Sequence, residues 1–271
     1  HADNMFEPSS HTAPIILTGY YKNSPFIVKI TCPANSIIVY QNSPNAVNHI
    51  FSTQNEAQIL KDIMHNVKSS ETPHIIKSYG ISICKITDIL STISEPDLLE
   101  VLKNPPQSIY EKLLYMYAEW NQISKFLKNS NRVYYNVMEL CETDLGSYYS
   151  DMGNSPMLQS IIKIHMFQIA YTLHVLQKKF PGFKHNDLHI GNVLVKLDRD
   201  FDKIDILHIK YNKYVIGKTS YYMPYFGNVI KIIDFGFAVH DTCPNAGASN
   251  NIIKHFRQSP DYCLYMTTLY N

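Results

Sequence analysis

Cysteine pairs, long apolar runs and blocks of like charge are missing from this sequence of 271 residues. The five cysteines are widely spaced and form no C-x-x-C pair, so they indicate neither a disulfide framework nor a zinc site. No apolar stretch reaches the roughly 18 residues that a membrane-spanning helix needs. The first ten residues contain no basic segment followed by an apolar one. We therefore expect a soluble protein of a reducing compartment, the cytoplasm.

An excess of one charge is also missing. The 24 basic and 23 acidic residues leave a formal net charge of +1, and no run of five Lys or Arg residues occurs. A strong field for nucleic acid is therefore not expected, and nucleic acid is not a predicted partner. With 45% hydrophobic residues, the chain can form one large domain or two lobes with an extensive core. The sequence leaves the oligomeric state open.

Strand-forming segments come mainly first and helical ones later, which is typical of an α+β fold. Residues 14–31 read as a β-hairpin, and short strands are expected at 74–84 and 132–140. The apolar spacing of TQNEAQILKDIM predicts a helix over 53–64, in which Thr53 and Glu56 would form a capping box. A second, longer helix is expected over 156–179, before Pro181-Gly182. A last helical run is expected near DYCLYMTTLY.

Two short motifs carry the chemistry. In HNDLHIGNVLVK, His185, Asp187 and Asn192 have the spacing H-x-D-x-x-x-x-N, after the predicted long helix and before a short strand. Further along, IIDFGFA places Asp234 directly after a β-branched run and before a Phe-Gly turn. Ordinary loop capping explains any one of these polar residues, but it explains three in this order poorly.

Phosphoryl transfer needs residues of these types, because its charged, loose transition state must be positioned and neutralised. Asp187 can accept the proton of a substrate hydroxyl or orient that hydroxyl. Asn192 and Asp234 offer hard oxygen ligands, which Mg²⁺ prefers together with waters and phosphate oxygens.

In this order the motifs resemble those of the eukaryotic protein kinase family, and DLHIGNVL is similar to the DLHxGN variant of haspin and of kinases from large DNA viruses. The resemblance implies a two-lobed α+β fold, with a small β-rich N-lobe that contains helix C and a larger, mainly helical C-lobe. It also implies Ser/Thr protein kinase activity, ATP and Mg²⁺ as cofactors and protein substrates. A viral source would place the protein in the host cytoplasm or the virion.

The resemblance also implies roles for residues outside the two motifs. Lys29 in FIVKI would bind the α- and β-phosphates, and Glu56 would be its ion-pair partner. Residues 1–140 would form the N-lobe, with a helical insertion near 86–130, and residues 141–271 the C-lobe, with an insertion near 197–228 and without its last helices. The nucleotide would contact Ser10, Ile27, Lys29, Met138, Glu139, Cys141 and Leu194.

Departures from the family pattern include three that affect the expected nucleotide and phosphate contacts. No G-x-G-x-x-G precedes Lys29, so Ser10 and its neighbours would have to cover the phosphates. Ile27 stands where the family has a small Ala against adenine. His189 replaces the usual Lys two residues after the catalytic Asp and would clamp the γ-phosphate more weakly than an ammonium group.

Two other functions remain open at this stage. A small-molecule phosphotransferase of the aminoglycoside or choline kinase type shares HxDLHxGN but usually lacks a clean D-F-G, so IIDFGFA favours the protein kinase. A pseudokinase scaffold is favoured by the absent glycine loop and by Ile27, but opposed by the full set of catalytic residue types. That set comprises Lys29, Glu56, Asp187, Asn192 and Asp234.

Overall fold

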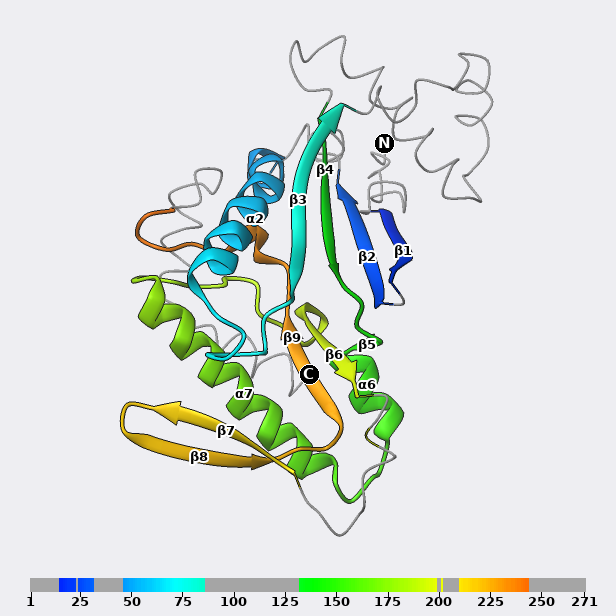
Figure 1. Cartoon of the computed structure of the whole chain (residues 1–271), viewed down its shortest axis with the longest axis vertical. Coiled ribbons are helices and arrows are strands. Elements are labelled where there is room, and N and C mark those ends of the chain that lie inside the picture. Colours follow the sequence, from blue (N-terminus) through cyan, green and yellow to red (C-terminus); the bar gives the residue numbers. More distant parts are fainter. Residues whose placement is uncertain are drawn as a thin grey trace, which may run out of the picture. The chain divides into compact units, whose positions relative to one another are not determined.

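The computed structural model describes residues 15–22, 24–31, 46–85, 132–198, 201 and 210–243 (Figure 1). These residues divide into two compact units. Unit 1 holds the described residues up to Ala57 together with Ser78–Glu139, and unit 2 holds Gln58–Lys77 together with those from Leu140 onward. The helical insertion expected near 86–130 and the last helical run expected near DYCLYMTTLY lie outside the described residues.

Unit 1 contains a four-stranded antiparallel sheet with the strand order β1-β2-β4-β3. Its strands are β1 (Ile15–Tyr21), β2 (Ser24–Thr31), β3 (Ser78–Lys85) and β4 (Arg132–Glu139). The hairpin and both short strands expected from the sequence are confirmed. The strand expected from 74 begins only at Ser78, because Ile75 pairs instead with Ile232 of unit 2.

Helix α2 (Ala46–Asn66) includes the helix expected over 53–64 but begins at Ala46. Thr53 therefore lies inside the helix, and the interpretation of Thr53 and Glu56 as a capping box was wrong. The apolar spacing marked only the packed part of the helix, where Ile59, Leu60 and Ile63 are buried. The boundary between the two units falls within α2, after Ala57.

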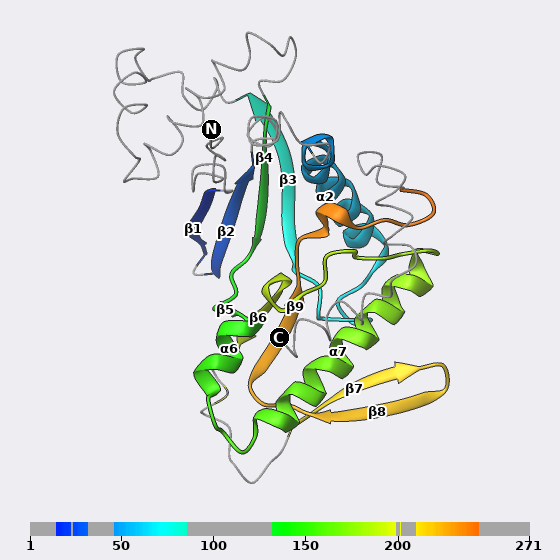
Figure 2. The same cartoon turned by 180° about the vertical axis from the view of Figure 1, so that it is seen from behind.

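Among its described residues, unit 2 contains the C-terminal part of α2, two further helices and a three-stranded sheet of order β5-β6-β9 (Figure 2). Helix α7 (Leu158–Lys179) confirms the predicted long helix, and its buried side chains include Ile161, Ile169, Leu173 and Leu176. The buried residues Val193, Val195, Ile230 and Ile232 of the sheet add to this core. The remaining elements are β5 (Thr143–Asp144), α6 (Leu145–Met152), β6 (Val193–Leu197) and β9 (Asn228–Ile232).

A second hairpin occupies the region where an insertion near 197–228 was expected. Strands β7 (Tyr211–Ile216) and β8 (Thr219–Pro224) pair in antiparallel fashion around a turn in which Gly217 has φ +60°. The hairpin contributes Tyr214 to a buried cluster with Tyr171 and Val175 of α7. Tyr214 therefore serves packing, whereas Tyr211, Tyr221 and Tyr222 of the same hairpin are exposed.

The described elements form a mixed α/β protein with a sheet-rich N-terminal region, in agreement with the expected α+β class. Among the described residues, no helix has the length and apolar character that crossing a membrane requires.

Candidate active site

Strands β6 and β9 bring the two motifs to the same end of the unit 2 sheet. The strands are antiparallel and pair Val193 with Ile232, so the residue before β6 lies beside the residue after β9. The backbone amide of Ile233 accordingly donates to the carbonyl oxygen of Asn192, at 3.0 Å. A short 3₁₀ turn, η2 (Ile190–Asn192), comes directly before β6. A second one, η4 (Phe235–Phe237), comes shortly after β9. Sheet pairing thus brings together motifs that are far apart in the sequence.

Asn192 is hydrogen-bonded to Asp187 twice. Its Nδ2 donates to the backbone carbonyl of Asp187 at 2.8 Å and to carboxylate Oδ2 at 3.1 Å. Asn192 is buried, whereas the Asp187 side chain is 40% exposed. With Nδ2 used in this way, the amide oxygen Oδ1 is the atom of Asn192 that is left for a cation.

The carboxylates of Asp187 and Asp234 interact electrostatically. Burial raises the pKa of Asp187, and the negative charge of Asp234 raises it further, while His189, His185 and the hydrogen bond from Asn192 act in the opposite direction. Asp234 has φ +61°, and its side chain makes no capping hydrogen bond to η4 among the described residues. Three of the predicted site residues are therefore grouped in unit 2: Asp187, Asn192 and Asp234.

His185 and Asn186 tie the first motif to the second. His185 is fully buried, its Nε2 is hydrogen-bonded to the carbonyl oxygen of Ile233 at 2.9 Å, and its ring lies 5.1 Å from that of Phe235. Through these contacts His185 supports the loop that carries Asp187. Asn186 has φ +65°, and its Nδ2 donates to the Phe237 carbonyl at 2.9 Å. The sequence analysis did not predict this hydrogen bond between the two motifs. The residue type offered a signal, because among the residues other than Gly, Asn is one of those that most readily adopt a positive φ.

His189 is oriented by the backbone next to it. Its Nδ1 accepts a hydrogen bond from the Gly191 amide at 3.1 Å, so this nitrogen carries no proton in this arrangement. In the neutral ring Nε2 then carries the proton, and this atom lies 4.0 Å from Oδ1 of Asp187. The imidazole is 43% exposed, so a substrate or phosphate group can reach it.

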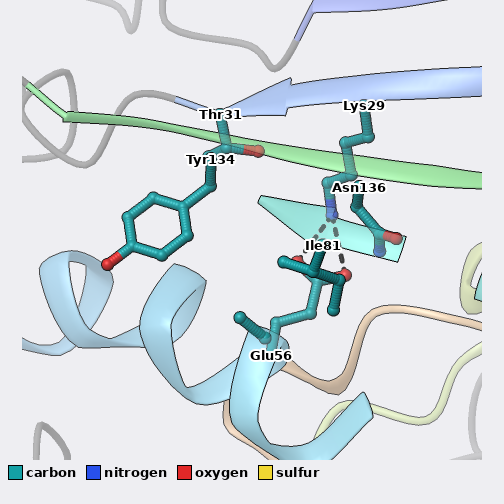
Figure 3. Close-up of a pocket in the computed structure, with 7 residues that line it drawn as sticks. Lys29, Thr31, Glu56, Ile81, Tyr134 and Asn136 are labelled. Atoms are coloured by element: carbon teal, nitrogen blue, oxygen red, sulfur yellow. Dashed lines mark hydrogen bonds and ion pairs between the residues drawn. The ribbon is translucent and has the colours of Figure 1, made fainter. Parts of the chain in front are cut away.

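In unit 1, Lys29 and Glu56 form an ion pair, as the resemblance implied. Nζ of Lys29 lies 3.1 Å from Oε1 and 3.0 Å from Oε2 of Glu56, and only 17% and 12% of the two side chains are exposed. The pair lies in a small pocket, shown in Figure 3, whose other lining residues are Thr31, Ala57, Ile81, Tyr134 and Asn136. A cation held in this way by strand β2 and helix α2 is positioned to bind an anionic group.

The residues expected around adenine occupy different parts of the structure. Ile27 on β2 is the register partner of Met138 on β4, and Glu139 ends β4 as the partner of Phe26. Cys141 and Leu194 belong to unit 2, where both are partly exposed. Ser10 lies outside the described residues.

Comparison with known proteins gives three kinase relatives. No protein-family model matches the chain. Two proteins of Acanthamoeba polyphaga mimivirus that are named as serine/threonine-protein kinases match at 31% identity over 69% of the chain and at 26% identity over 64% of it. A serine/threonine-protein kinase of Dictyostelium discoideum matches at 30% identity over 48% of the chain.

The chain spans less than half the length of each of these relatives: 37% and 46% of the two mimivirus proteins and 10% of the Dictyostelium protein. All three names denote the same class of enzyme, and two of the three proteins come from a large virus. The resemblance to divergent serine/threonine protein kinases, first recognised in the two loop motifs, is thereby confirmed.

Proposed function

We propose that this chain contains the catalytic region of a Ser/Thr protein kinase, which transfers the γ-phosphoryl group of Mg-ATP to protein hydroxyls. One observation carries the proposal: the carboxylate of Asp187 accepts a hydrogen bond from Asn192 and interacts electrostatically with Asp234. Phosphoryl transfer needs a base and two metal ligands of these types close together. The Lys29–Glu56 ion pair in unit 1 supports it independently. In this proposal residues 1–140 would form the N-lobe and residues 141–271 the C-lobe; this division differs from that of the compact units, because Gln58–Lys77 group with unit 2.

Asp187 is the proposed catalytic base. Its carboxylate would accept the proton of the attacking hydroxyl as the oxygen bonds to phosphorus, and the hydrogen bond from Asn192 would keep the side chain turned toward the substrate. His189, with Nε2 facing the same carboxylate, would donate to a phosphate oxygen. Nucleic acid is not proposed as a substrate, because the chain has a formal net charge of only +1.

The proposed metal ligands fit Mg²⁺ in their chemistry. Oδ1 of Asn192 and the carboxylate of Asp234 are hard oxygen donors, and neither oxygen is committed to the hydrogen bonds described above. Bound Mg²⁺ would neutralise charge on the phosphate oxygens. The part played by the protein is to hold both oxygens at one end of the β6–β9 sheet.

The nucleotide-binding roles that the resemblance implies are part of the proposal. Lys29, held by Glu56, would bind the α- and β-phosphates. In unit 1 the base would contact Ile27 and the backbone near Met138 and Glu139. The candidates for base contact in unit 2 are Cys141 and Leu194. Ser10 and its neighbours would cover the phosphates in place of a glycine-rich loop.

The deciding experiment follows transfer of labelled γ-phosphate from ATP in the presence of Mg²⁺. Basic and acidic model proteins are offered in one set of reactions, and aminoglycosides and amino alcohols such as choline in another. Labelling of serine and threonine in the proteins supports the proposal. Labelling of the small molecules alone would instead identify a small-molecule phosphotransferase. Nucleotide binding without transfer to any acceptor would identify a scaffold.

A further inference from the structure

Three side chains with metal-ligand chemistry meet in unit 2, and none of them belongs to the two kinase motifs. They are Asp62 of α2, His240 and Cys243, and the ligand atoms all lie within 4.8 Å of one another. Two of them form the sequence H-x-x-C in the segment after the Asp-Phe-Gly turn. In Figures 1 and 2 this segment passes beside α2.

His240 is the central observation. It is only 5% exposed, and its Nε2 has no hydrogen-bond partner within the part of the chain that the structure describes. This atom lies 3.4 Å from Oδ2 of Asp62. A buried ring nitrogen without a hydrogen bond is costly, and a cation with an open coordination position would remove that cost.

The separations suit a tetrahedral ion. With Zn–N and Zn–O bonds of about 2.0–2.1 Å, tetrahedral geometry places nitrogen and oxygen ligands about 3.3 Å apart. The distance of 3.4 Å between His240 Nε2 and Asp62 Oδ2 matches this value. The Cys243 sulfur lies within 4.8 Å of a ring nitrogen of His240 and of a carboxylate oxygen of Asp62, and it would move inward by about 1 Å to complete the set.

Neighbouring groups already orient two of the three ligands. Nδ1 of His240 is hydrogen-bonded to the Thr242 hydroxyl at 3.0 Å, which leaves Nε2 as the ligand atom. The Asp62 carboxylate accepts from Gln58 Nε2 at 3.0 Å through Oδ1, so that Oδ2 faces His240. The ring of Phe180 lies 5.0 Å from the imidazole and helps to fix its plane. Support of this kind is what protein metal sites require around their ligands.

We propose that Asp62, His240 and Cys243 form a zinc site that joins helix α2 to the segment following the Asp-Phe-Gly turn. Thiolate, imidazole and carboxylate together favour Zn²⁺ over Mg²⁺ or Ca²⁺, which prefer oxygen ligands alone. On binding, the Cys243 thiol releases its proton to solvent and a water molecule occupies the fourth position. The site does not depend on the proposed kinase activity, because none of its ligands is a catalytic or nucleotide-binding residue.

The test uses the purified wild-type chain, stripped with a chelator and titrated with Zn²⁺ against a chromophoric zinc indicator. We expect one zinc ion per chain, and Co²⁺ in its place should give the absorption of a tetrahedral cobalt site with a thiolate charge-transfer band. Asp62→Asn, His240→Gln and Cys243→Ser should each weaken zinc binding at least about 100-fold. Thr242→Val, which removes only the orienting hydroxyl, should weaken it by about 10–100-fold.

Cys84→Ser serves as the matched control, because Cys84 lies in unit 1 and should leave zinc binding unchanged. Circular dichroism of every metal-free variant checks that the fold is retained. Absence of zinc binding by the folded wild type would overturn the proposal. Binding that survives all three ligand substitutions, or an octahedral cobalt spectrum without a thiolate band, would overturn it as well. None of these readouts involves ATP, so the result is independent of whether the chain is a kinase.

Discussion

Nδ2 of Asn192 donates to both the backbone carbonyl and the carboxylate of Asp187, at 2.8 and 3.1 Å. The hydrogen bond to the carbonyl stabilises the backbone of the loop between Asp187 and Asn192, and the hydrogen bond to the carboxylate orients the Asp187 side chain. Because the Ile233 amide also donates to the carbonyl of Asn192, the loop is tied to the strand that leads to Asp234. A substitution that removes the charge of Asp187 but keeps its hydrogen bond to Asn192 can therefore test the role of the charge without disturbing the loop.

Asp187→Asn should abolish most phosphoryl transfer while leaving the loop intact. The amide oxygen of the new side chain can still accept from Asn192, but it cannot take up a proton. We expect the turnover number to fall by about 10²–10⁴-fold with little change in melting temperature. Asp151→Asn, at an exposed position of α6, is the control. Full turnover in the Asp187 variant would exclude this residue as the base.

Lys29→Met should impair the use of ATP. The ammonium group is fixed by both carboxylate oxygens of Glu56, and the variant loses a preorganised phosphate donor. We expect kcat/KM for ATP to fall by about 10²–10³-fold. Lys22→Met, at an exposed lysine in the turn of the same hairpin, should have no effect. Wild-type ATP kinetics in the Lys29 variant would show that the ion pair is only structural.

Gly191→Ala should act through His189. A Cβ at position 191 would come within 3.0 Å of Cε1 and 3.1 Å of Nδ1 of that imidazole, so the ring must shift. Because small displacements of positioned groups are costly, we expect activity to fall by about 10–100-fold. The same substitution should have no further effect when it is added to His189→Ala. Additive losses in the double variant would mean that Gly191 matters for another reason.

Local motifs allowed the candidate site to be predicted, because the spacing around Asp187 and Asn192 and the D-F-G turn at Asp234 are properties of short segments. Their convergence depends on the pairing of β6 with β9, which joins segments far apart in the chain. Periodicity identified α7 correctly for a similar reason: its apolar positions repeat along one face over the whole helix.

Three elements were predicted incompletely or not at all. Helix α2 extends back to Ala46, ahead of the apolar spacing that predicted it. The β7–β8 hairpin was expected only as an insertion, although β-rich runs flank Gly217-Lys218. Helix α6 was missed, although Asp144 caps it by accepting from the Ser147 amide at 3.0 Å.

His165 has a neutral, buried environment. Its Nε2 is hydrogen-bonded to Asn228 Oδ1 at 2.8 Å and its Nδ1 to the Tyr149 hydroxyl at 3.1 Å, while the Tyr148 ring lies 6.1 Å away. None of these neighbours carries a charge near neutral pH, and the hydrogen bond to Asn228, which raises the pKa of His165, offsets only part of the effect of burial. Burial therefore lowers the pKa of His165 to about 4, from 6.5.

Folding stability should consequently decrease in mild acid. The unfolded chain protonates His165 near pH 6.5 and the folded chain only near pH 4, so the stability that the neutral ring provides is complete above pH 6.5 and lost progressively below it. At about pH 5 the loss is about 2 kcal/mol. His165→Gln cannot titrate, so denaturant unfolding of this variant between about pH 7.5 and pH 5 should show a decrease smaller by that amount. His65→Gln, at an exposed position, should follow the wild type. Parallel curves for wild type and the His165 variant would contradict the assignment of a depressed pKa.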